Sequence, residues 1–239
     1  MGTSSPKLVV ALDVATFEEA IALAKVMQGL PVWMKVGLEL FTACGKEVVK
    51  TLRDMGFPVF LDLKFHDIPN TVAKAVASAG KLDVGILTLH TSGGKAMLEA
   101  ARQSCEALRV QGITPPLLLG VTVLTSQSPE ELGLDEAGLR ALVVERAKLG
   151  AEAHLDGVVC SGHEASSIKE ACGQDFICLC PGIRFAGAAT CHDQARVMTP
   201  DKAAKAGADF IVMGRPLREA PSPEKAAREA LGLLGSHTE

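Results

Sequence analysis

Short apolar runs alternate with longer segments of helical period along the whole chain, and this alternation constrains the fold more than any other feature. Eight such runs are rich in Val, Leu and Ile: Lys7–Asp13, Val32–Val36, Pro58–Lys64, Asp83–His90, Leu117–Leu124, Gly157–Cys160, Phe176–Cys180 and Asp209–Gly214. Apolar runs without polar alternation are typical of parallel strands that are covered on both faces. We therefore expect eight buried parallel strands.

The segments between the runs carry apolar residues at helical spacing. Thr16–Gly29 is predicted as one helix, Phe41–Gly56 as another, and Thr125–Leu155 as a loop followed by one helix. Glycines that precede the next strand are expected to close several helices, namely Gly29, Gly56, Gly80, Gly150 and Gly207.

Dividing 239 residues among eight strand–helix units gives about 30 residues each, the unit size of a (β/α)8, or TIM, barrel of about 250 residues. No linker divides the chain, so we predict a single α/β barrel domain over residues 1–239, with residues 1–6 as a disordered extension. The pattern alone also permits an open, doubly wound sheet. The phosphate-binding signatures usual in that fold, Gly-x-Gly-x-x-Gly and the Walker loop, are missing from the sequence.

Composition excludes several classes of protein. A hydrophobic content of 48% with 22% charged residues is not that of a disordered chain, and no apolar run approaches the roughly 18 residues of a membrane span. A net charge of −4 without a basic block argues against a nucleic-acid partner. The seven scattered cysteines include no Cys-x-x-Cys pair, which favours reduced thiols over disulfides or zinc. We expect a cytoplasmic protein.

Residues suited to chemistry collect where the predicted strands end, which is where the chemistry of such a barrel takes place. They are Asp13, Lys35, Asp62, Lys64, His90, Thr125, Arg184 and the pair Gly214-Arg215. We expect His90 to be a packed, hydrogen-bonded residue rather than a catalyst.

Asp62 and Lys64 are two residues apart, so a strand directs both side chains to the same face. With Lys35 and Asp67 they form an alternating series of charges, an arrangement in which each ion offsets the desolvation of its neighbours. Opposite neighbours also favour the charged form of each group. Two simpler interpretations remain open: Asp62–Lys64 could be a structural ion pair, and Asp67 could cap the helix that begins at Ile68–Thr71.

The segment Phe210–Pro216 predicts a strand, a glycine, an arginine and the start of a helix. Exposed backbone N–H groups and a guanidinium form an anion site, and barrels commonly bind phosphate with the loops after strands seven and eight. Pro181–Arg184 begins the seventh loop. An ordinary glycine turn with a surface arginine is the alternative.

These motifs resemble the bacterial form of the orotidine 5′-monophosphate decarboxylase family. The segment Leu61-Asp-Leu-Lys-Phe-His-Asp-Ile-Pro-Asn-Thr71 carries the resemblance. Supporting motifs are Ala11–Asp13, Lys35–Gly37, His90–Gly94, Val121–Ser126, Pro181–Arg184, Asp193–Gln194 and Met213–Pro216. The similarity extends from about Leu8 to the final helix.

The resemblance implies a homodimeric (β/α)8 barrel that decarboxylates orotidine 5′-phosphate to uridine 5′-phosphate, the last step of de novo pyrimidine synthesis, without metal or organic cofactor. It implies that Lys64 protonates C6, that Asp62 lies against the substrate carboxylate, and that Lys35 and Asp67 complete the charge series. It also implies that Asp13 and Lys35 bind the ribose hydroxyls and that Thr125 and Ser126 bind the pyrimidine. The phosphate would be bound by Arg184, Gln194, Gly214 and Arg215. Ile68 and Thr71 are further implied substrate-binding residues. Asp67 and Thr71 would reach into the site of the partner subunit.

Two alternative functions stay open. The magnesium-dependent 3-keto-L-gulonate 6-phosphate decarboxylases share the Asp-x-Lys-x-x-Asp core, but they carry an acidic residue where this chain has Lys35, which would repel a divalent cation. A non-catalytic barrel that binds nucleotide phosphates would use the charge series for structure only.

Overall fold

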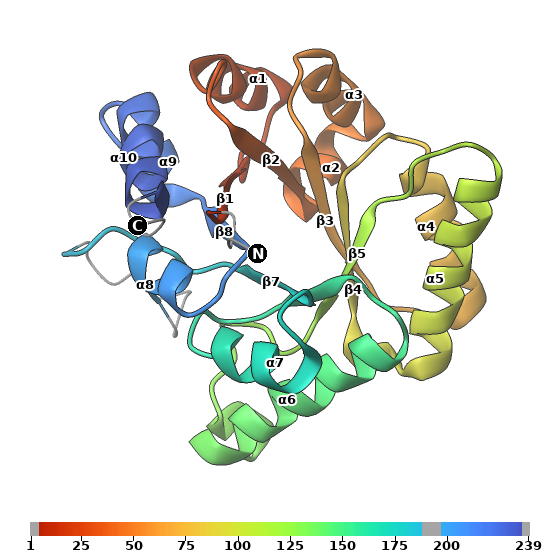
Figure 1. Cartoon of the computed structure of the whole chain (residues 1–239). Coiled ribbons are helices and arrows are strands. Elements are labelled where there is room, and N and C mark those ends of the chain that lie inside the picture. Colours follow the sequence, from red (N-terminus) through yellow and green to blue (C-terminus); the bar gives the residue numbers. More distant parts are fainter. Residues whose placement is uncertain (1–4, 188–196, 236–239) are drawn as a thin grey trace.

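Eight parallel strands close into a barrel in which each strand pairs with its neighbours along the chain (Figure 1). The computed structural model describes residues 5–187 and 197–235. The strands are β1 (Lys7–Ala11), β2 (Val32–Gly37), β3 (Val59–Phe65), β4 (Ile86–His90), β5 (Leu117–Val121), β6 (Gly157–Val159), β7 (Ile177–Cys180) and β8 (Phe210–Met213). Pairing of β1 with β8 forms the seam of the barrel. The predicted closed (β/α)8 barrel is confirmed, and the open sheet is not.

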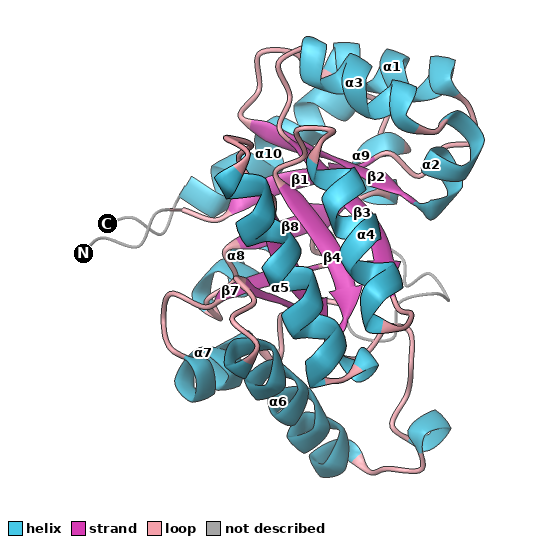
Figure 2. Cartoon of the chain, turned by 90° about the vertical axis from the view of Figure 1, so that its right-hand side faces the viewer, coloured by secondary structure: helices cyan, strands magenta, loops and turns pink. Residues whose placement is uncertain are grey.

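Helices surround the barrel, as Figure 2 shows for α4 and α5, which lie side by side. They are α1 (Phe17–Val26), α2 (Leu38–Cys44), α3 (Lys46–Asp54), α4 (Pro69–Gly80), α5 (Lys95–Val110), α6 (Glu136–Glu152), α7 (Ala165–Cys172), α8 (Pro200–Lys205), α9 (Arg215–Arg218) and α10 (Pro223–Gly235). Within residues 5–187 and 197–235, no helix has the length and apolar character that crossing a membrane requires.

The first helix illustrates how local sequence fixes an element. Thr16 precedes α1 in an extended conformation, and its hydroxyl accepts a hydrogen bond from the backbone N–H of Glu19 at 3.3 Å. The Glu19 carboxylate accepts one in return from the backbone N–H of Thr16 at 3.2 Å. This reciprocal cap satisfies two N–H groups that the helix leaves unpaired. Ala20, Leu23 and Ala24 then face the barrel.

Apolar residues form two layers, one inside the barrel and one between the barrel and its helices. The inner layer includes Val9, Phe60, Ile86, Leu119 and Phe210, and each of them is at most 3% exposed. The outer layer joins the opposite faces of the strands to the helices. Since side chains fill the barrel interior, its open space lies above them, at the carboxyl ends of the strands.

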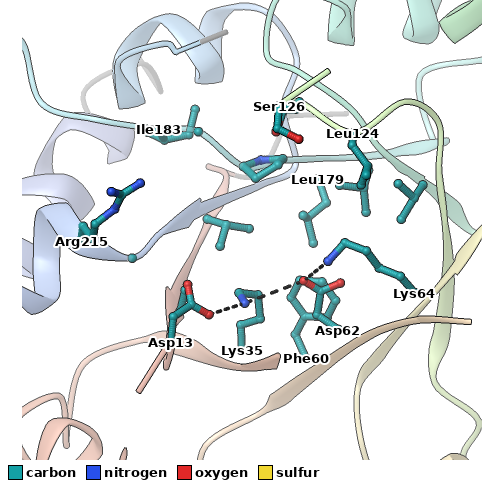
Figure 3. Close-up of a pocket in the computed structure, with 18 of the residues that line it drawn as sticks. Asp13, Lys35, Phe60, Asp62, Lys64, Leu124, Ser126, Leu179, Ile183 and Arg215 are labelled. Atoms are coloured by element: carbon teal, nitrogen blue, oxygen red, sulfur yellow. Dashed lines mark hydrogen bonds and ion pairs between the residues drawn. The ribbon is translucent and has the colours of Figure 1, made fainter. Parts of the chain in front are cut away.

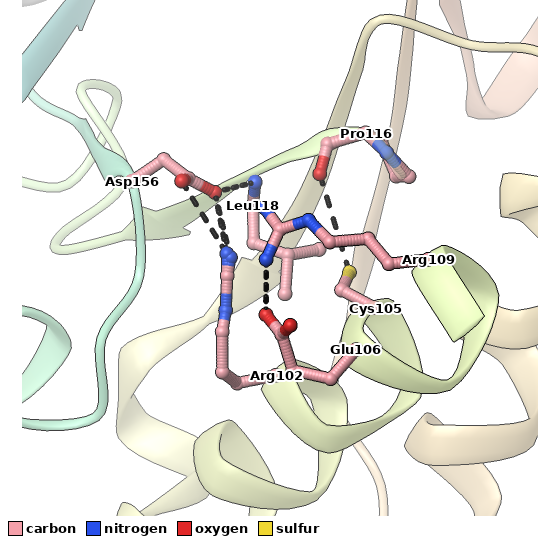
Figure 4. Close-up of polar contacts among 7 residues, drawn as sticks. All are labelled: Arg102, Cys105, Glu106, Arg109, Pro116, Leu118 and Asp156. Atoms are coloured by element: carbon pink, nitrogen blue, oxygen red, sulfur yellow. Dashed lines mark hydrogen bonds and ion pairs between the residues drawn. The ribbon is translucent and has the colours of Figure 1, made fainter. Parts of the chain in front are cut away.

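Ion pairs join helices to strands at the opposite, amino-terminal end of the barrel. In each ion pair, a cationic side chain on a helix contacts an aspartate that lies just before β4, β6 or β8. The pairs are Arg53–Asp83, Arg102–Asp156 and Lys169–Asp209. Figure 4 shows the second of them, in which the Asp156 carboxylate also accepts the backbone N–H of Leu118 at 2.7 Å. We call these three pairs the basal ion pairs.

The predicted single helix over Phe41–Gly56 is wrong, because the structure divides it into α2 and α3. Gly45 separates the two helices with a φ of 61° and a ψ of −149°, a conformation that glycine adopts without the penalty of a Cβ atom. The apolar positions on either side keep helical spacing, so the periodicity alone gave no sign of the break.

One of the five glycines predicted to close helices does not do so, because Gly150 lies inside α6. Gly80 is the last residue of α4. Gly29, Gly56 and Gly207 follow helices with positive φ angles, as expected. The predicted loop and helix of Thr125–Leu155 are confirmed, with a short 3-10 turn preceding α6.

Several predicted strands are too long. β1 ends at Ala11 instead of Asp13, β5 ends at Val121 instead of Leu124, and β4 begins at Ile86 instead of Asp83. The extra residues belong to loops at the two ends of the barrel. The apolar pattern continues into these loops, so the sequence does not mark where the strands begin and end.

Candidate active site

A cavity of about 580 Å³ opens at the carboxyl ends of the strands (Figure 3). Its apolar lining includes Phe60, Val121, Leu179 and Val212. The cavity brings together nine of the residues singled out from the sequence: Asp13, Lys35, Asp62, Lys64, Thr125, Ser126, Arg184, Gly214 and Arg215. Its volume is typical of a site for a small organic molecule.

Four of these side chains form a series of alternating charges, which we call the charged row (Figure 3). Lys35 Nζ lies 2.8 Å from Asp13 Oδ1 and 3.8 Å from Asp62 Oδ2, and Lys64 Nζ lies 2.8 Å from the same Asp62 oxygen. The Lys35 and Asp62 side chains are each only 11% exposed. Burial of this extent is tolerable because each ion has an opposite charge beside it.

The charged row keeps Asp62 ionised. Burial would raise the pKa of this carboxyl, but the charges of Lys35 and Lys64, together with hydrogen bonds from Lys64 and Thr88, lower it below its ordinary value of 3.8. Asp62 therefore carries a negative charge throughout the neutral pH range.

The backbone of β3 is irregular where it carries this row. Leu61 pairs with Leu87, and Phe65 pairs with Leu89. Between these two pairs the chain advances by four positions in β3 but by only two in β4. Lys64 has a φ of 48°, in a region that residues with side chains seldom occupy. Asp62 and Lys64 thus both reach the cavity, as the spacing predicted, but through a distorted strand.

A residue that the sequence analysis did not single out lies opposite this distortion. The Thr88 hydroxyl in β4 donates to Asp62 Oδ1 at 2.9 Å and accepts the backbone N–H of Lys64 at 3.0 Å. Thr88 is fully buried. Thr88 interrupts the otherwise apolar segment Ile86–Leu89, and this was the available signal.

The structure places Asp67, Ile68 and Thr71 on the surface, outside the cavity lining. The proposed capping role of Asp67 is wrong, because α4 begins at Pro69 and Ile68 occupies the capping position without a side-chain bond. Asp67 instead accepts the backbone N–H of the adjacent Ile68 at 2.6 Å. In the single chain, the fourth member of the charged row is Asp13. Gln194 and Asp193 lie outside the described residues.

His90 packs against His66 with ring centroids 5.3 Å apart. Burial lowers the pKa of His90, and the charges of His66, Lys64 and Arg146 lower it further. The expected packing of His90 is observed, and the cavity lining does not include this residue. That His90 is not a catalyst stays a prediction.

The cavity contains cationic groups on two sides. Figure 3 shows Arg215 across the cavity from Lys64, and Arg215 directly follows Gly214 at the start of α9. Among the described residues, no group of three or more His, Cys, Asp or Glu side chains is arranged to hold a metal ion. An ammonium held by a carboxylate near an apolar surface can donate a proton, while a guanidinium on the far side can bind an anionic group.

Comparison with known proteins gives consistent matches over nearly the whole chain. Residues 6–230 match the family model described as Orotidine 5'-phosphate decarboxylase / HUMPS family. The orotidine 5'-phosphate decarboxylase of Nitratidesulfovibrio vulgaris (strain Miyazaki F) is 49% identical, covering 95% of this chain and 97% of that protein. The enzyme of that name from Idiomarina loihiensis is 50% identical, with coverages of 96% and 98%. The crystal structure of the Lactobacillus acidophilus enzyme has a TM-score of 0.84 at 34% identity, covering 97% of this chain and all of that one.

Proposed function

Since this chain belongs to the orotidine 5'-phosphate decarboxylase / HUMPS family, we propose that it converts orotidine 5′-phosphate to uridine 5′-phosphate and carbon dioxide, the last step of de novo pyrimidine synthesis, without a cofactor. The observation that carries this proposal is the charged row, in which the Lys64 ammonium is held 2.8 Å from Asp62 at a cavity with an apolar lining. This arrangement supports Lys64 as a fixed proton donor beside a bound pyrimidine.

The reaction needs a proton and a stabilising field at one carbon. The bond from C6 to the carboxylate breaks, its electron pair stays on C6, and the Lys64 ammonium donates the proton that C6 takes up. Lys64 then regains a proton from solvent. Because no cofactor accepts the electron density at C6, stabilisation must come from charges that are already in position. Asp62 lies against the substrate carboxylate and holds the ammonium in place.

The remaining groups bind parts of the substrate that do not react. Asp13 and Lys35 bind the ribose hydroxyls, and Thr125 and Ser126 bind the pyrimidine. The phosphate is bound by Arg184, Gln194, Gly214 and Arg215. Binding energy from a phosphate remote from C6 can order the site and exclude water. We therefore expect orotidine, which lacks the phosphate, to lose most of kcat/KM.

Lys35 disfavours the magnesium-dependent alternative. Its ammonium lies between the carboxylates of Asp13 and Asp62, 2.8 Å from the first and 3.8 Å from the second. A divalent cation held by these oxygens would have to displace it or bear its repulsion. No observation favours a binding protein without catalysis.

The proposed enzyme acts as a homodimer. Asp67 and Thr71 are exposed outside the cavity of their own chain, and the neighbouring Ile68 is 66% exposed. Leu38, which follows β2, is 56% exposed. Exposed apolar residues near the site support a second copy that receives Asp67 and Thr71. Mixing inactive Lys64→Ala and Asp67→Ala chains should restore part of the activity through hybrid dimers; no recovery despite proven subunit exchange would contradict a shared site. The cytoplasmic location stays a prediction.

A spectrophotometric assay of orotidine 5′-phosphate tests the proposed activity. Purified protein should consume the substrate equally well with and without a chelator. Lys64→Ala should lower kcat by at least about 100-fold, the lower range for loss of a positioned acid. Lys95→Ala is the matched control, because Lys95 is an exposed residue outside the cavity lining that forms a surface ion pair with Glu99 at 3.9 Å. A wild-type protein that leaves the substrate unchanged would refute the proposal.

A further inference from the structure

We infer that Thr88 is a positioning residue for the decarboxylation, acting through the charged row without touching the substrate. The inference rests on the proposed function and goes beyond it, because Thr88 does not line the cavity. Its hydroxyl is the one group that bonds both to the side chain of Asp62 and to the backbone of Lys64 among the described hydrogen bonds.

The first step of the argument is the backbone of β3. Between Leu61 and Phe65 the regular pairing with β4 is interrupted, and Lys64 adopts a φ of 48°. A partly buried N–H group in an interrupted ladder needs another acceptor, since leaving it unsatisfied away from water costs as much as a lost hydrogen bond. The Thr88 hydroxyl is that acceptor at 3.0 Å. Thr88 therefore stabilises the unusual backbone from which the Lys64 side chain extends.

The second step is the orientation of the carboxylate. Asp62 Oδ2 faces both lysines, and Oδ1 accepts the Thr88 hydroxyl at 2.9 Å. One oxygen is thus fixed by the charged row and the other by β4, so the carboxylate cannot rotate without breaking a bond. The same hydrogen bond favours the ionised form of Asp62.

The third step is the chemical role of a hydroxyl at this position. Only a group that donates and accepts can serve both partners at once, and threonine does so with a single oxygen. Valine has the same shape and can do neither. Displacement of a reacting group by about 1 Å can lower the rate about 100-fold. Loss of this hydroxyl should therefore lower kcat strongly and change KM little.

The test compares Thr88→Val and Thr88→Ser with a matched control. Thr91 is equally buried, and its hydroxyl donates to the Val121 carbonyl at 2.9 Å without contact to the charged row. We expect Thr88→Val to lower kcat by roughly 10- to 100-fold, the value for one lost hydrogen bond to a charged group, with KM changed less than about threefold. Thr88→Ser should recover most of kcat. Thr91→Val should lose stability but keep kcat within about twofold.

A pH profile separates positioning from general stability. Without the Thr88 hydroxyl the pKa of Asp62 should be higher, so kcat of Thr88→Val should decline at a higher pH on the acid side than kcat of the wild type. If Thr88→Val does not fold, Thr88→Cys takes its place. Because a thiol donates and accepts only weakly, the kcat of Thr88→Cys should lie below that of Thr88→Ser.

The inference is overturned if a folded Thr88→Val or Thr88→Cys has the kcat of the wild type, if serine does not rescue, or if Thr91→Val loses kcat equally. A wild type without activity would instead refute the proposed function. Wild-type activity together with an unaffected Thr88 variant would refute only the role of Thr88.

Discussion

The basal ion pair between Arg102 and Asp156 gives a prediction of stability that is independent of the chemistry. The Asp156 carboxylate accepts the Leu118 N–H at 2.7 Å and receives Arg102 Nη1 and Nη2 at 3.2 to 3.3 Å. The two side chains are 25% and 13% exposed. Asp156→Asn preserves the shape of the side chain, removes its charge and leaves one acceptor oxygen for three donor nitrogens.

The magnitude follows from that loss. One hydrogen bond to a charged group contributes about 1.5–3 kcal/mol. The partial exposure of Asp156 keeps the effect below the roughly 3–5 kcal/mol of a fully buried pair that loses one partner. For a chain of this size, about 2–4 °C of Tm corresponds to each kcal/mol, so Tm should fall by about 3–12 °C. Activity at 25 °C should be retained, since the pair lies at the end of the barrel away from the cavity.

Urea and thermal unfolding measure this effect. Glu224→Gln is the control, because Glu224 and Arg228 form a surface pair whose side chains are 46% and 61% exposed. It should change the free energy of unfolding by no more than about 0.5 kcal/mol. Combining Asp156→Asn with Arg102→Met gives the coupling energy of the pair. If Asp156→Asn is as mild as Glu224→Gln, or if the coupling is near zero, the structural importance of this basal pair is refuted.

Two further predictions concern the charged row and the packing of the strands. Burial raises the pKa of Asp62, but Lys35 and Lys64 lower it more, so it lies below 3.8 in the folded protein. The wild type should therefore have a higher free energy of unfolding than Asp62→Asn above about pH 4, and this difference should decline as the pH falls through the lowered pKa. Urea unfolding of both proteins between about pH 2.5 and 6 measures the difference. A difference that grows on acidification would contradict the prediction. A Cβ atom at Gly157 would lie 2.2 Å from the carbonyl oxygen of Ile177, so Gly157→Ala should separate β6 from β7 and reduce the yield of folded protein. Gly232→Ala, exposed in α10 with nothing within 4 Å, should instead raise stability by about 0.5–1 kcal/mol, and equal melting temperatures for the two variants would count against the packing argument.

The sequence was sufficient for the barrel and for most of the cavity because both depend on local patterns. Continuous apolar runs identify covered strands, and polar residues at their ends identify the open end of the barrel. Asp62, Lys64 and Arg215 were found in this way, and all three line the cavity.

Features that depend on contacts between distant residues were missed. The hydroxyl of Thr88 meets Asp62 across a strand pair, 26 positions apart along the chain, and nothing in the local pattern of either strand specifies that contact. The break at Gly45 was missed because the apolar spacing continues across it. Asp67 lies on the surface outside the cavity of its own chain, so its role in the site of a partner subunit stays a prediction.

The seam between β1 and β8 has a consequence for the timing of activity during synthesis. Asp13 follows the first strand and Arg215 follows the last, yet both line one cavity. A nascent chain on the ribosome consequently has no complete cavity until its eighth strand has emerged and joined the first. Truncated translation products should therefore be inert instead of partly active.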